Sequence, residues 1–157
     1  MKKQWVLRQA TASDLDEMIQ LFSDVVSNVN ARDYTPEQLK EWLRSSSNTE
    51  RWQALISEQY VVVAQHGDDL VGFASLTPDA YLDFMYVHKD HQRKGVAQTL
   101  YDHLEQQAEE TNASKLQSDV SITARPFFER QGFKVVRTNH NQRNKEVLIN
   151  YRMEKVL

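Results

Sequence analysis

The stretch "YLDFMYVHKDHQRKGVAQTLYDHLE" (residues 81–105) contains the clearest structural signal in the chain. It opens on an apolar run that predicts a β-strand over 80–87. Apolar residues at helical spacing follow, from Val96 to about residue 112. Between the two lies a basic turn that holds Gly95, one of only four glycines in the chain. A strand, a short basic loop and a helix in this order indicate an α/β domain, and the loop is a candidate binding site.

The loop has the residues that an anion site at a helix N-terminus requires. The first N–H groups of a helix have no intrahelical partner, and the helix dipole adds about half a positive charge there. Gly95 lets the backbone approach phosphate oxygens, and Ala97 keeps the next inward position small. Arg93 and Lys94 add positive charge. A solvated basic turn has a similar composition, so the exact residue pattern of the loop must decide between an anion site and a solvated turn.

Two common nucleotide-binding motifs do not fit this loop. The sequence contains no G-x-x-x-x-G-K-[ST] string, and a dinucleotide fingerprint needs three spaced glycines where only Gly95 is present. The pattern that does fit is Gln/Arg-x-x-Gly-x-Gly/Ala, which Gln92, Gly95 and Ala97 satisfy.

The rest of the chain alternates between helical and strand patterns. One helix start is marked by a capping box of Thr35 and Gln38, with Pro36 at the first helical position. The expected elements, besides those in the opening stretch, are a strand at 5–9, a helix capped by Ser13, the helix capped by Thr35, a helix at 49–58, strands at 60–65 and 70–76, a strand at 114–120, a helix at 123–132 capped by Thr123, and strands at 133–139 and 146–153. This order predicts a single domain over 1–157, of mixed α/β class, built around one sheet.

Composition limits the function further. The formal net charge is −3, so we expect no nucleic-acid partner, and no apolar run is long enough to span a membrane. The chain has no cysteine, which excludes disulfides, a thiolate nucleophile and cysteine-based metal sites. The five histidines show no metal-ligand spacing, so we expect no metal. A cytoplasmic protein without a membrane partner is the expectation.

Several motifs in order resemble the GNAT superfamily of acetyl-CoA-dependent N-acetyltransferases. The opening stretch from Leu82 resembles the family's motif A, "SITARPFFERQGFKVV" (121–136) its motif B, and "LVGFASL" (70–76) the strand between the first helices and motif A. "LRQATASDLDEMIQLF" (7–22) resembles its first strand and helix, so the likeness covers nearly the whole chain. The helix "YTPEQLKEW" (34–42), together with motif B, resembles a bacterial branch of the family. The resemblance implies a mostly antiparallel central sheet of six to seven strands flanked by about four to five helices.

The resemblance also implies acetyl-CoA as co-substrate and a set of residues that bind it. Met85, Tyr86 and Val87 would pair through their backbone with the pantetheine arm, on a strand that splays from its neighbour. The N–H near Met85 would hold the developing oxyanion. The loop would hold the diphosphate through Gln92, Arg93, Lys94, Gly95, Val96 and Ala97, extending to Gln98.

Asp83 is the expected general base. An alkylamine is mostly protonated at neutral pH, so a carboxylate commonly takes its proton, directly or through water. Asp83 interrupts an apolar strand, and side-chain alternation places it on the same face as Tyr81 and Met85. A buried carboxylate needs a partner or a function, so a structural ion pair is the alternative interpretation.

The residues expected beside the leaving thiolate of coenzyme A depart from the family pattern. Phe128 occupies the position of the family's motif B tyrosine, and Ser121 that of its asparagine. Phe128 is expected to line the pantetheine channel but has no proton to donate. Three possibilities stay open: the thiolate leaves unaided, since a thiol pKa is near 8.5; Ser121 assists; or a tyrosine, Tyr81 or Tyr86, assists.

The expected reaction is direct acetyl transfer from acetyl-CoA to a primary amine of a small molecule or peptide, because the chain has no cysteine for a thioester intermediate. The acceptor pocket is expected between the first helices and the C-terminal hairpin, with aromatic walls. Its candidate aromatics are Tyr34, Trp42, Trp52 and Tyr81, although the helical spacing of Trp42 equally fits a core position. The alternative is a GNAT-like module that binds acyl-CoA without turnover, and the chain is expected to be a monomer or a homodimer.

Overall fold

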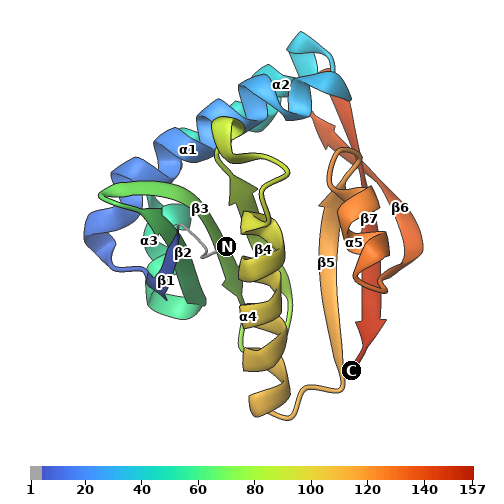
Figure 1. The fold of residues 1–157 in the computed structure, drawn as a ribbon. Helices are drawn as coiled ribbons and strands as arrows, with labels where there is room; N and C mark the ends of the chain where they lie inside the picture. The colour runs from blue at the N-terminus through green and yellow to red at the C-terminus, as the bar shows by residue number, and fades with distance from the viewer. Residues whose placement is uncertain (1–4) are drawn as a thin grey trace.

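A computed structural model describes residues 5–157 as seven β-strands and five α-helices, joined by short 3₁₀ turns (Figure 1). In chain order these are β1 (Val6–Gln9), α1 (Leu15–Asn28), α2 (Pro36–Leu43), α3 (Thr49–Glu58), β2 (Tyr60–His66), β3 (Asp69–Leu76), β4 (Leu82–Val87), α4 (Val96–Glu110), β5 (Lys115–Ser121), α5 (Arg125–Arg130), β6 (Lys134–Arg143) and β7 (Glu146–Val156). The mixed α/β class and the antiparallel character of the strands are confirmed.

The strands form two sheets where the sequence predicted one. The first has the order β1-β2-β3-β4 and the second β5-β7-β6, and every pairing within them is antiparallel. The sheet is divided because β4 is joined to β5 only at the start of β4, opposite the middle of β5. There, Tyr81 forms a parallel bridge with Gln117, and the Ser118 hydroxyl donates to the carbonyl of Leu82 at 2.7 Å. No ladder joins β4 to β5 anywhere else in residues 5–157, so the two strands diverge.

The first sheet is covered on both faces, and strand alternation decides which side chain enters which core. In β2, Val62 and Ala64 belong to the core beneath α4, whereas Val61 and Val63 belong to the core beneath α1, α2 and α3. Because both faces are buried, β2 and β3 read as continuous apolar runs. Helix α5 covers the second sheet, placing Phe128 in the core shared with α4 (Figure 1).

The helix starts show where local sequence signals are reliable. The capping box at Thr35 is confirmed: the Gln38 N–H donates to Thr35 Oγ1 at 3.1 Å, and Gln38 Oε1 accepts from the Thr35 N–H at 2.8 Å. The predicted cap at Ser13 is wrong, because a 3₁₀ turn precedes α1 and Asp14 is its N-cap. The predicted cap at Thr123 is also wrong, since α5 begins later and Ala124 is its N-cap.

Candidate active site

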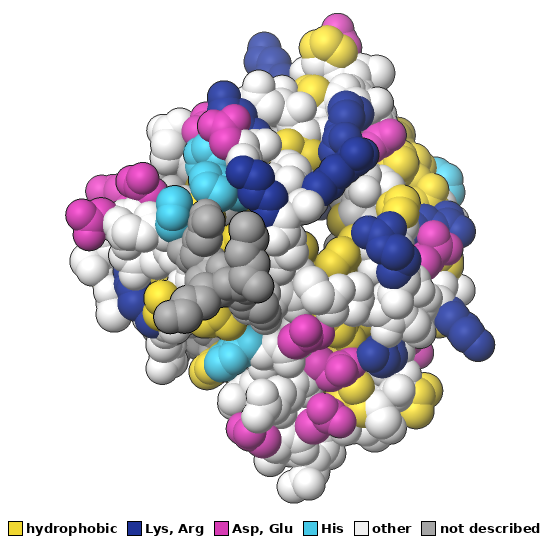
Figure 2. Space-filling view, in the orientation of Figure 1, with side chains coloured by type: hydrophobic (Ala, Val, Ile, Leu, Met, Phe, Trp, Pro, Cys, Tyr) yellow, Lys and Arg dark blue, Asp and Glu magenta, His cyan; other side chains and the backbone are white. Residues whose placement is uncertain are grey.

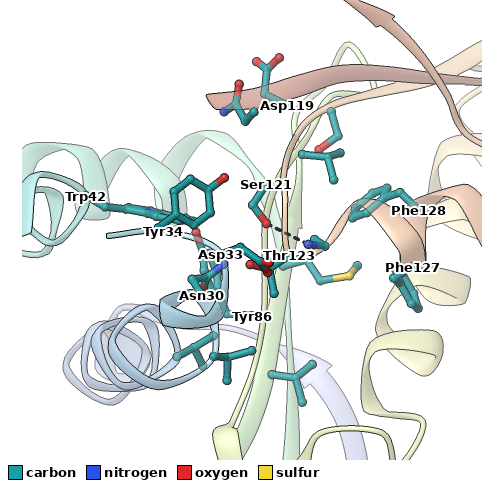
Figure 3. Close-up of a pocket in the computed structure, with 18 of the residues that line it drawn as sticks. Asn30, Asp33, Tyr34, Trp42, Tyr86, Asp119, Ser121, Thr123, Phe127 and Phe128 are labelled. Atoms are coloured by element: carbon teal, nitrogen blue, oxygen red, sulfur yellow. Dashed lines mark hydrogen bonds between the residues drawn. The ribbon is translucent and has the colours of Figure 1, made fainter. Parts of the chain in front are cut away.

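A cleft of about 1570 Å³ lies where the two sheets diverge. Its lining comes from β4, the loop before α4, β5, α5 and β7, and from the segment between α1 and α2. In Figure 3, Tyr34 and Trp42 lie on one side of the cleft, and Phe127 and Phe128 lie on the other. A ligand bound in this cleft would contact both sheets.

The glycine loop has a conformation that only glycine adopts easily. Gly95 is the N-cap of α4 and lies in the left-handed region, with φ +91° and ψ 6°. A Cβ added at this position would meet only the Trp5 ring, at 3.8 Å, so the backbone conformation and not the available space demands glycine. The Gln92 side chain donates to the carbonyl of Val87 at 2.6 Å. That bond fastens the loop to the end of β4 and leaves the loop backbone facing the cleft.

The start of α4 offers backbone donors to this cleft. The N–H groups of Val96, Ala97 and Gln98 belong to the first turn, where no intrahelical acceptor exists, and all three residues line the cleft. The Val96 side chain is buried in the core, so only its backbone can serve a ligand. The Gln98 side chain bonds Asp102 at 2.8 Å and Gln131 at 2.9 Å, which ties α4 to the end of α5. Free N–H groups at the start of a helix, lining a cleft, form a site that can bind an anion.

Positive charge surrounds the outer opening of the cleft. Arg93 and Arg130 both line it, from the loop and from the end of α5, and Figure 2 shows Lys and Arg side chains around a hollow on this face. Lys94 is exposed and is not among the lining residues. His91 also lines the cleft, and burial lowers its pKa, as do the neighbouring His88 and Lys94. The lining of the opening therefore carries the positive charges of Arg93 and Arg130, which suits a polyanion, whereas Lys94 lies outside the lining.

A β-bulge interrupts β4 where it faces the cleft. Ala74 pairs with Met85 and Leu76 with Leu82, so that Ser75 on β3 faces both Asp83 and Phe84. The bulge reverses the expected alternation. Phe84 packs into the core of α1–α3, while Met85 packs against the core beneath α4. The prediction that Asp83 and Met85 share a face is wrong, because Asp83 bonds side chains from the α3 segment on the other face.

The backbone direction along β4 follows from two hydrogen bonds to β3. The N–H of Phe84 donates to a serine hydroxyl on β3 at 3.1 Å, and the N–H of His88 donates to a β3 carbonyl at 2.8 Å. Backbone direction alternates along a strand, so the N–H groups of Met85 and Val87 point away from β3, toward the cleft. The N–H of Tyr86 faces β3. Of the three predicted backbone contacts, Met85 and Val87 are oriented toward the cleft and Tyr86 is not.

Asp83 is held by two partners that the sequence analysis did not identify. Its Oδ1 accepts from Arg51 at 3.2 Å, and its Oδ2 accepts from the Gln59 side chain at 2.7 Å. Arg51 also lies over the Phe84 ring, 4.8 Å from its centroid. Asp83 lines the cleft with 14 % of its side chain exposed, so both the ion pair and a role toward a ligand are compatible with this position.

Tyr81 belongs to a polar network at the junction of the two sheets. Its hydroxyl donates to Asp119 on β5 at 2.7 Å, and Arg152 binds the same carboxylate at 2.8 Å. Burial and the acceptor Asp119 raise the pKa of Tyr81. Burial raises the pKa of Asp119, but hydrogen bonds from Arg152, Tyr81 and Asn139 outweigh it and hold that pKa below its usual value. In the sequence, Asp119 is one of several polar residues in an alternating strand, so no pattern identified it as a candidate site residue.

Ser121 and Phe128 lie on either side of the start of α5. Ser121 Oγ accepts from the Ala124 N–H at 3.0 Å, which holds the turn before α5 without capping the helix. Phe128 is buried and packs edge-on against Phe133, with 5.1 Å between ring centroids. Both residues line the cleft. The side chain of Phe128 belongs largely to the core.

The aromatic wall of the cleft contains part of the predicted set. Tyr34 and Trp42 pack edge to face at 5.1 Å and line the cleft, whereas Trp52 is buried in the core and does not line it. The Tyr34 hydroxyl donates to the carbonyl of Ile149 at 2.6 Å and accepts from the Ile122 N–H at 3.0 Å. Burial raises the pKa of Tyr34 to about 12. Tyr34 thus joins the α1–α2 segment to β7 and to the end of β5.

The comparisons with known proteins agree with this geometry. The family model described as "Acetyltransferase (GNAT) domain" matches residues 30–156. The chain belongs to the GNAT acetyltransferase family. Among curated proteins it is 31% identical, over 131 residues, to the uncharacterized N-acetyltransferase YafP of Escherichia coli strain K12, covering 83% of this chain and 82% of that one.

Solved GNAT structures have the same fold. A GCN5-related N-acetyltransferase from Rhodopseudomonas palustris superimposes with a TM-score of 0.93 at 32% identity, covering 100% of this chain and 98% of that one. The PaiA N-acetyltransferase from Thermoplasma acidophilum, solved in complex with coenzyme A, has a TM-score of 0.78 at 19% identity, covering 99% and 100%. The resemblance to the GNAT family read from the sequence is therefore confirmed.

Within residues 5–157, no helix has the length and apolar character to cross a bilayer. The same residues contain no group of three or more His, Cys, Asp or Glu side chains placed to hold a metal ion.

Proposed function

We propose that this GNAT acetyltransferase is an N-acetyltransferase that moves an acetyl group from acetyl-CoA directly to a primary amine of a small molecule or peptide. The observation that carries the proposal is the direction of the Met85 and Val87 N–H groups. They face a cleft that leads to the Gly95 loop, so the free edge of β4 and the start of α4 lie along one path. The diphosphate binds at the loop, and the pantetheine arm extends along β4 into the cleft.

Each end of this path has its own chemistry. At the loop, the first-turn N–H groups of α4 and the Arg93 guanidinium neutralise the diphosphate. At the bulge, the Met85 N–H donates to the thioester oxygen and stabilises the negative charge that develops there. The PaiA structure, a protein of the same fold solved in complex with coenzyme A, supports coenzyme A as the ligand.

Asp83 serves as the base, through a water molecule. Arg51 and Gln59 keep the carboxylate fixed, and each carboxylate oxygen retains a further lone pair for a water hydrogen bond. The bulge turns Asp83 toward the α1–α3 side, so the amine approaches from that side, opposite the α4 face where Met85 packs. The aromatic wall of Tyr34 and Trp42 encloses the non-reacting part of the acceptor.

A screen of primary amines with acetyl-CoA tests the proposal. The protein is incubated with acetyl-CoA and a panel of alkylamines, amino-acid amides and short peptides, and the release of free thiol is followed. We expect release that depends on the amine, together with an N-acetylated product identified by mass spectrometry. Tight acetyl-CoA binding with no amine-dependent thiol release for any acceptor class would contradict catalysis and indicate a binding module.

A further inference from the structure

The cleft contains a hydroxyl group that none of the roles above uses. Thr123 Oγ1 is fully buried and has neither a donor nor an acceptor among the described residues. Thr123 lines the cleft, on the loop between β5 and α5. In Figure 3 it lies near the middle of the cleft, between the aromatic side at Tyr34 and the side of Phe128. A buried hydroxyl without a hydrogen bond is costly, so this group indicates a ligand atom that completes it.

Each of the other hydroxyl groups that line the cleft has at least one hydrogen-bond partner in the protein. Four of them donate to protein acceptors: Tyr34 to the Ile149 carbonyl, Ser45 to the Trp42 carbonyl, Tyr81 to Asp119, and Ser118 to the Leu82 carbonyl.

Two further hydroxyl groups remain besides Thr123. Tyr86 packs its ring against Phe22 at 5.0 Å in the core of α1–α3, and a hydrogen bond with Trp42 holds its hydroxyl there. Ser121 holds the start of α5 through the Ala124 N–H. Thr123 is thus the hydroxyl whose donor and acceptor capacity are both unused.

We propose that the Thr123 hydroxyl donates a hydrogen bond to the sulfur of coenzyme A as the thioester breaks, in place of the tyrosine that Phe128 replaces. The proposal rests on the acetyl-transfer function proposed above. The position of Thr123 is well fixed, because the N–H of the preceding residue, Ile122, donates to the Tyr34 hydroxyl at 3.0 Å. Such a fixed donor needs no rearrangement when negative charge develops on the sulfur.

The step balances without a further reactant. The amine nitrogen attacks the carbonyl carbon, and the carbonyl electron pair moves to oxygen, beside the Met85 N–H. When the carbonyl re-forms, the carbon–sulfur bond breaks and the sulfur takes its electron pair as a thiolate. The excess proton on nitrogen passes through water to Asp83. Thr123 keeps its own proton, because an alcohol is far less acidic than a thiol, and the thiolate is protonated by solvent after release.

Kinetics of Thr123→Val provide the first test. Valine keeps the size and the branching of threonine but has no hydroxyl. We expect kcat to fall by roughly tenfold to a hundredfold, the scale of a hydrogen bond to a charged group, with the Kd for acetyl-CoA unchanged. Thr123→Ser should restore most of the rate. The matched control, Thr138→Val on the exposed strand β6, should behave as wild type.

Titration of bound coenzyme A provides a second test that needs no acceptor amine. The thiolate absorbs in the ultraviolet, so the pKa of the bound thiol can be measured directly. We expect this pKa to lie below that of free coenzyme A in the wild-type protein and in Thr123→Ser. In Thr123→Val it should rise by about one unit or more, which corresponds to a tenfold loss of thiolate stabilisation.

The outcomes separate the two proposals. An unchanged thiol pKa in Thr123→Val would overturn the role of Thr123, even if the wild-type protein acetylates amines normally. Weaker acetyl-CoA binding with an unchanged kcat would also overturn it and would assign Thr123 to the pantetheine amides. A wild-type protein that shifts the thiol pKa but acetylates no amine would contradict the proposed function and leave the hydrogen bond to sulfur supported. If Thr123→Val fails to fold, a loss of kcat of tenfold or more in a folded Thr123→Ser, which keeps the hydroxyl, would refute the proposal.

Discussion

Replacing Gly95 with valine would test the phosphate loop directly. Gly95 has φ +91°, and a Cβ there would lie 3.8 Å from the nearest atom, on Trp5. The substitution therefore creates no collision, and its cost comes from the backbone alone. A side chain in the left-handed region costs about 1–2 kcal/mol, and a β-branched residue is the worst case. This is a modest part of a typical folding free energy of about 5–15 kcal/mol, so we expect the variant to fold.

The effect on coenzyme A should be larger than the effect on folding. The loop can relieve the strain by moving φ to negative values, but this rotates the N–H groups at the start of α4 away from the diphosphate. A hydrogen bond to a charged group contributes about 1.5–3 kcal/mol. The loss of one such bond weakens binding by roughly tenfold to a hundredfold. We therefore expect the Kd for coenzyme A to rise more than tenfold in Gly95→Val.

Isothermal titration calorimetry with coenzyme A and with pantetheine, which lacks the diphosphate, measures this effect. The matched control is Gly67→Val, because Gly67 also has a positive φ of +61° and open space around it, but lies in the β2–β3 turn. Gly67→Val should lose a similar amount of stability while keeping its affinity for coenzyme A. Pantetheine should bind Gly95→Val and wild type equally. An unchanged Kd for coenzyme A in Gly95→Val would refute the phosphate cradle.

Three further results are expected. Asp83→Asn should bind acetyl-CoA normally but turn over an alkylamine roughly a hundredfold more slowly, with the rise of its pH–rate profile displaced toward the pKa of the free amine; a wild-type rate and profile would make Asp83 structural. Gly72→Ala should lower the free energy of unfolding by about 1 kcal/mol in a denaturant titration, because its Cβ would lie 3.1 Å from the Tyr86 carbonyl oxygen and equally close to two side chains of α4. An increase in stability would contradict this and show that the neighbouring atoms move aside at no cost. The pKa of Asp119 is lowered in the folded protein, so its carboxylate stabilises the fold above the unfolded pKa of about 4 and loses that contribution as the pH falls through the folded value. The stability difference between wild type and Asp119→Asn should therefore shrink as the pH falls below about 4, and a difference independent of pH would contradict the ionised network.

Local signals in the sequence were sufficient for most of the elements. The capping box at Thr35 and the hairpin over 60–76 depend on neighbours within a few residues, and both are present as expected. Ser13 failed as a cap because Asp14 has better partners. Its carboxylate accepts from Arg8 at 2.7 Å and from the Thr11 N–H at 2.8 Å. One of those bonds reaches across to β1, which a local pattern cannot show.

The bulge in β4 limited what could be predicted for the candidate site. Alternation is a sound rule for a regular strand, and the side chains of β2 follow it. One extra residue opposite Ser75 reverses it, so the faces of Asp83 and Met85 could not be read from the sequence. The partners Arg51 and Gln59 come from a helix more than twenty residues earlier, and no spacing rule connects them to Asp83.

Hydroxyl residues were the other point at which sequence reasoning failed. Thr123 and Ser121 are both typical capping residues near a helix start, and their sequence positions do not reveal where the helix begins. In the structure neither side chain caps α5: Ser121 Oγ accepts from the N–H of the N-cap residue, Ala124, and Thr123 Oγ1 is buried without a partner among the described residues. The sequence also could not distinguish a tryptophan in the cleft from one in the core. Trp42 lines the cleft and Trp52 fills the core, although both occur at helical spacing.

The most direct test of acetyl transfer to an amine uses acetyl-CoA labelled in the acetyl group. The protein is mixed with the labelled donor and an accepted amine, the reaction is quenched within the first turnover, and product and protein are both examined by mass spectrometry. We expect the label on the amine nitrogen from the first turnover onward, with none on the protein and none transferred without the amine. A labelled protein that forms before the product and decays as the amine is added would contradict direct transfer from acetyl-CoA.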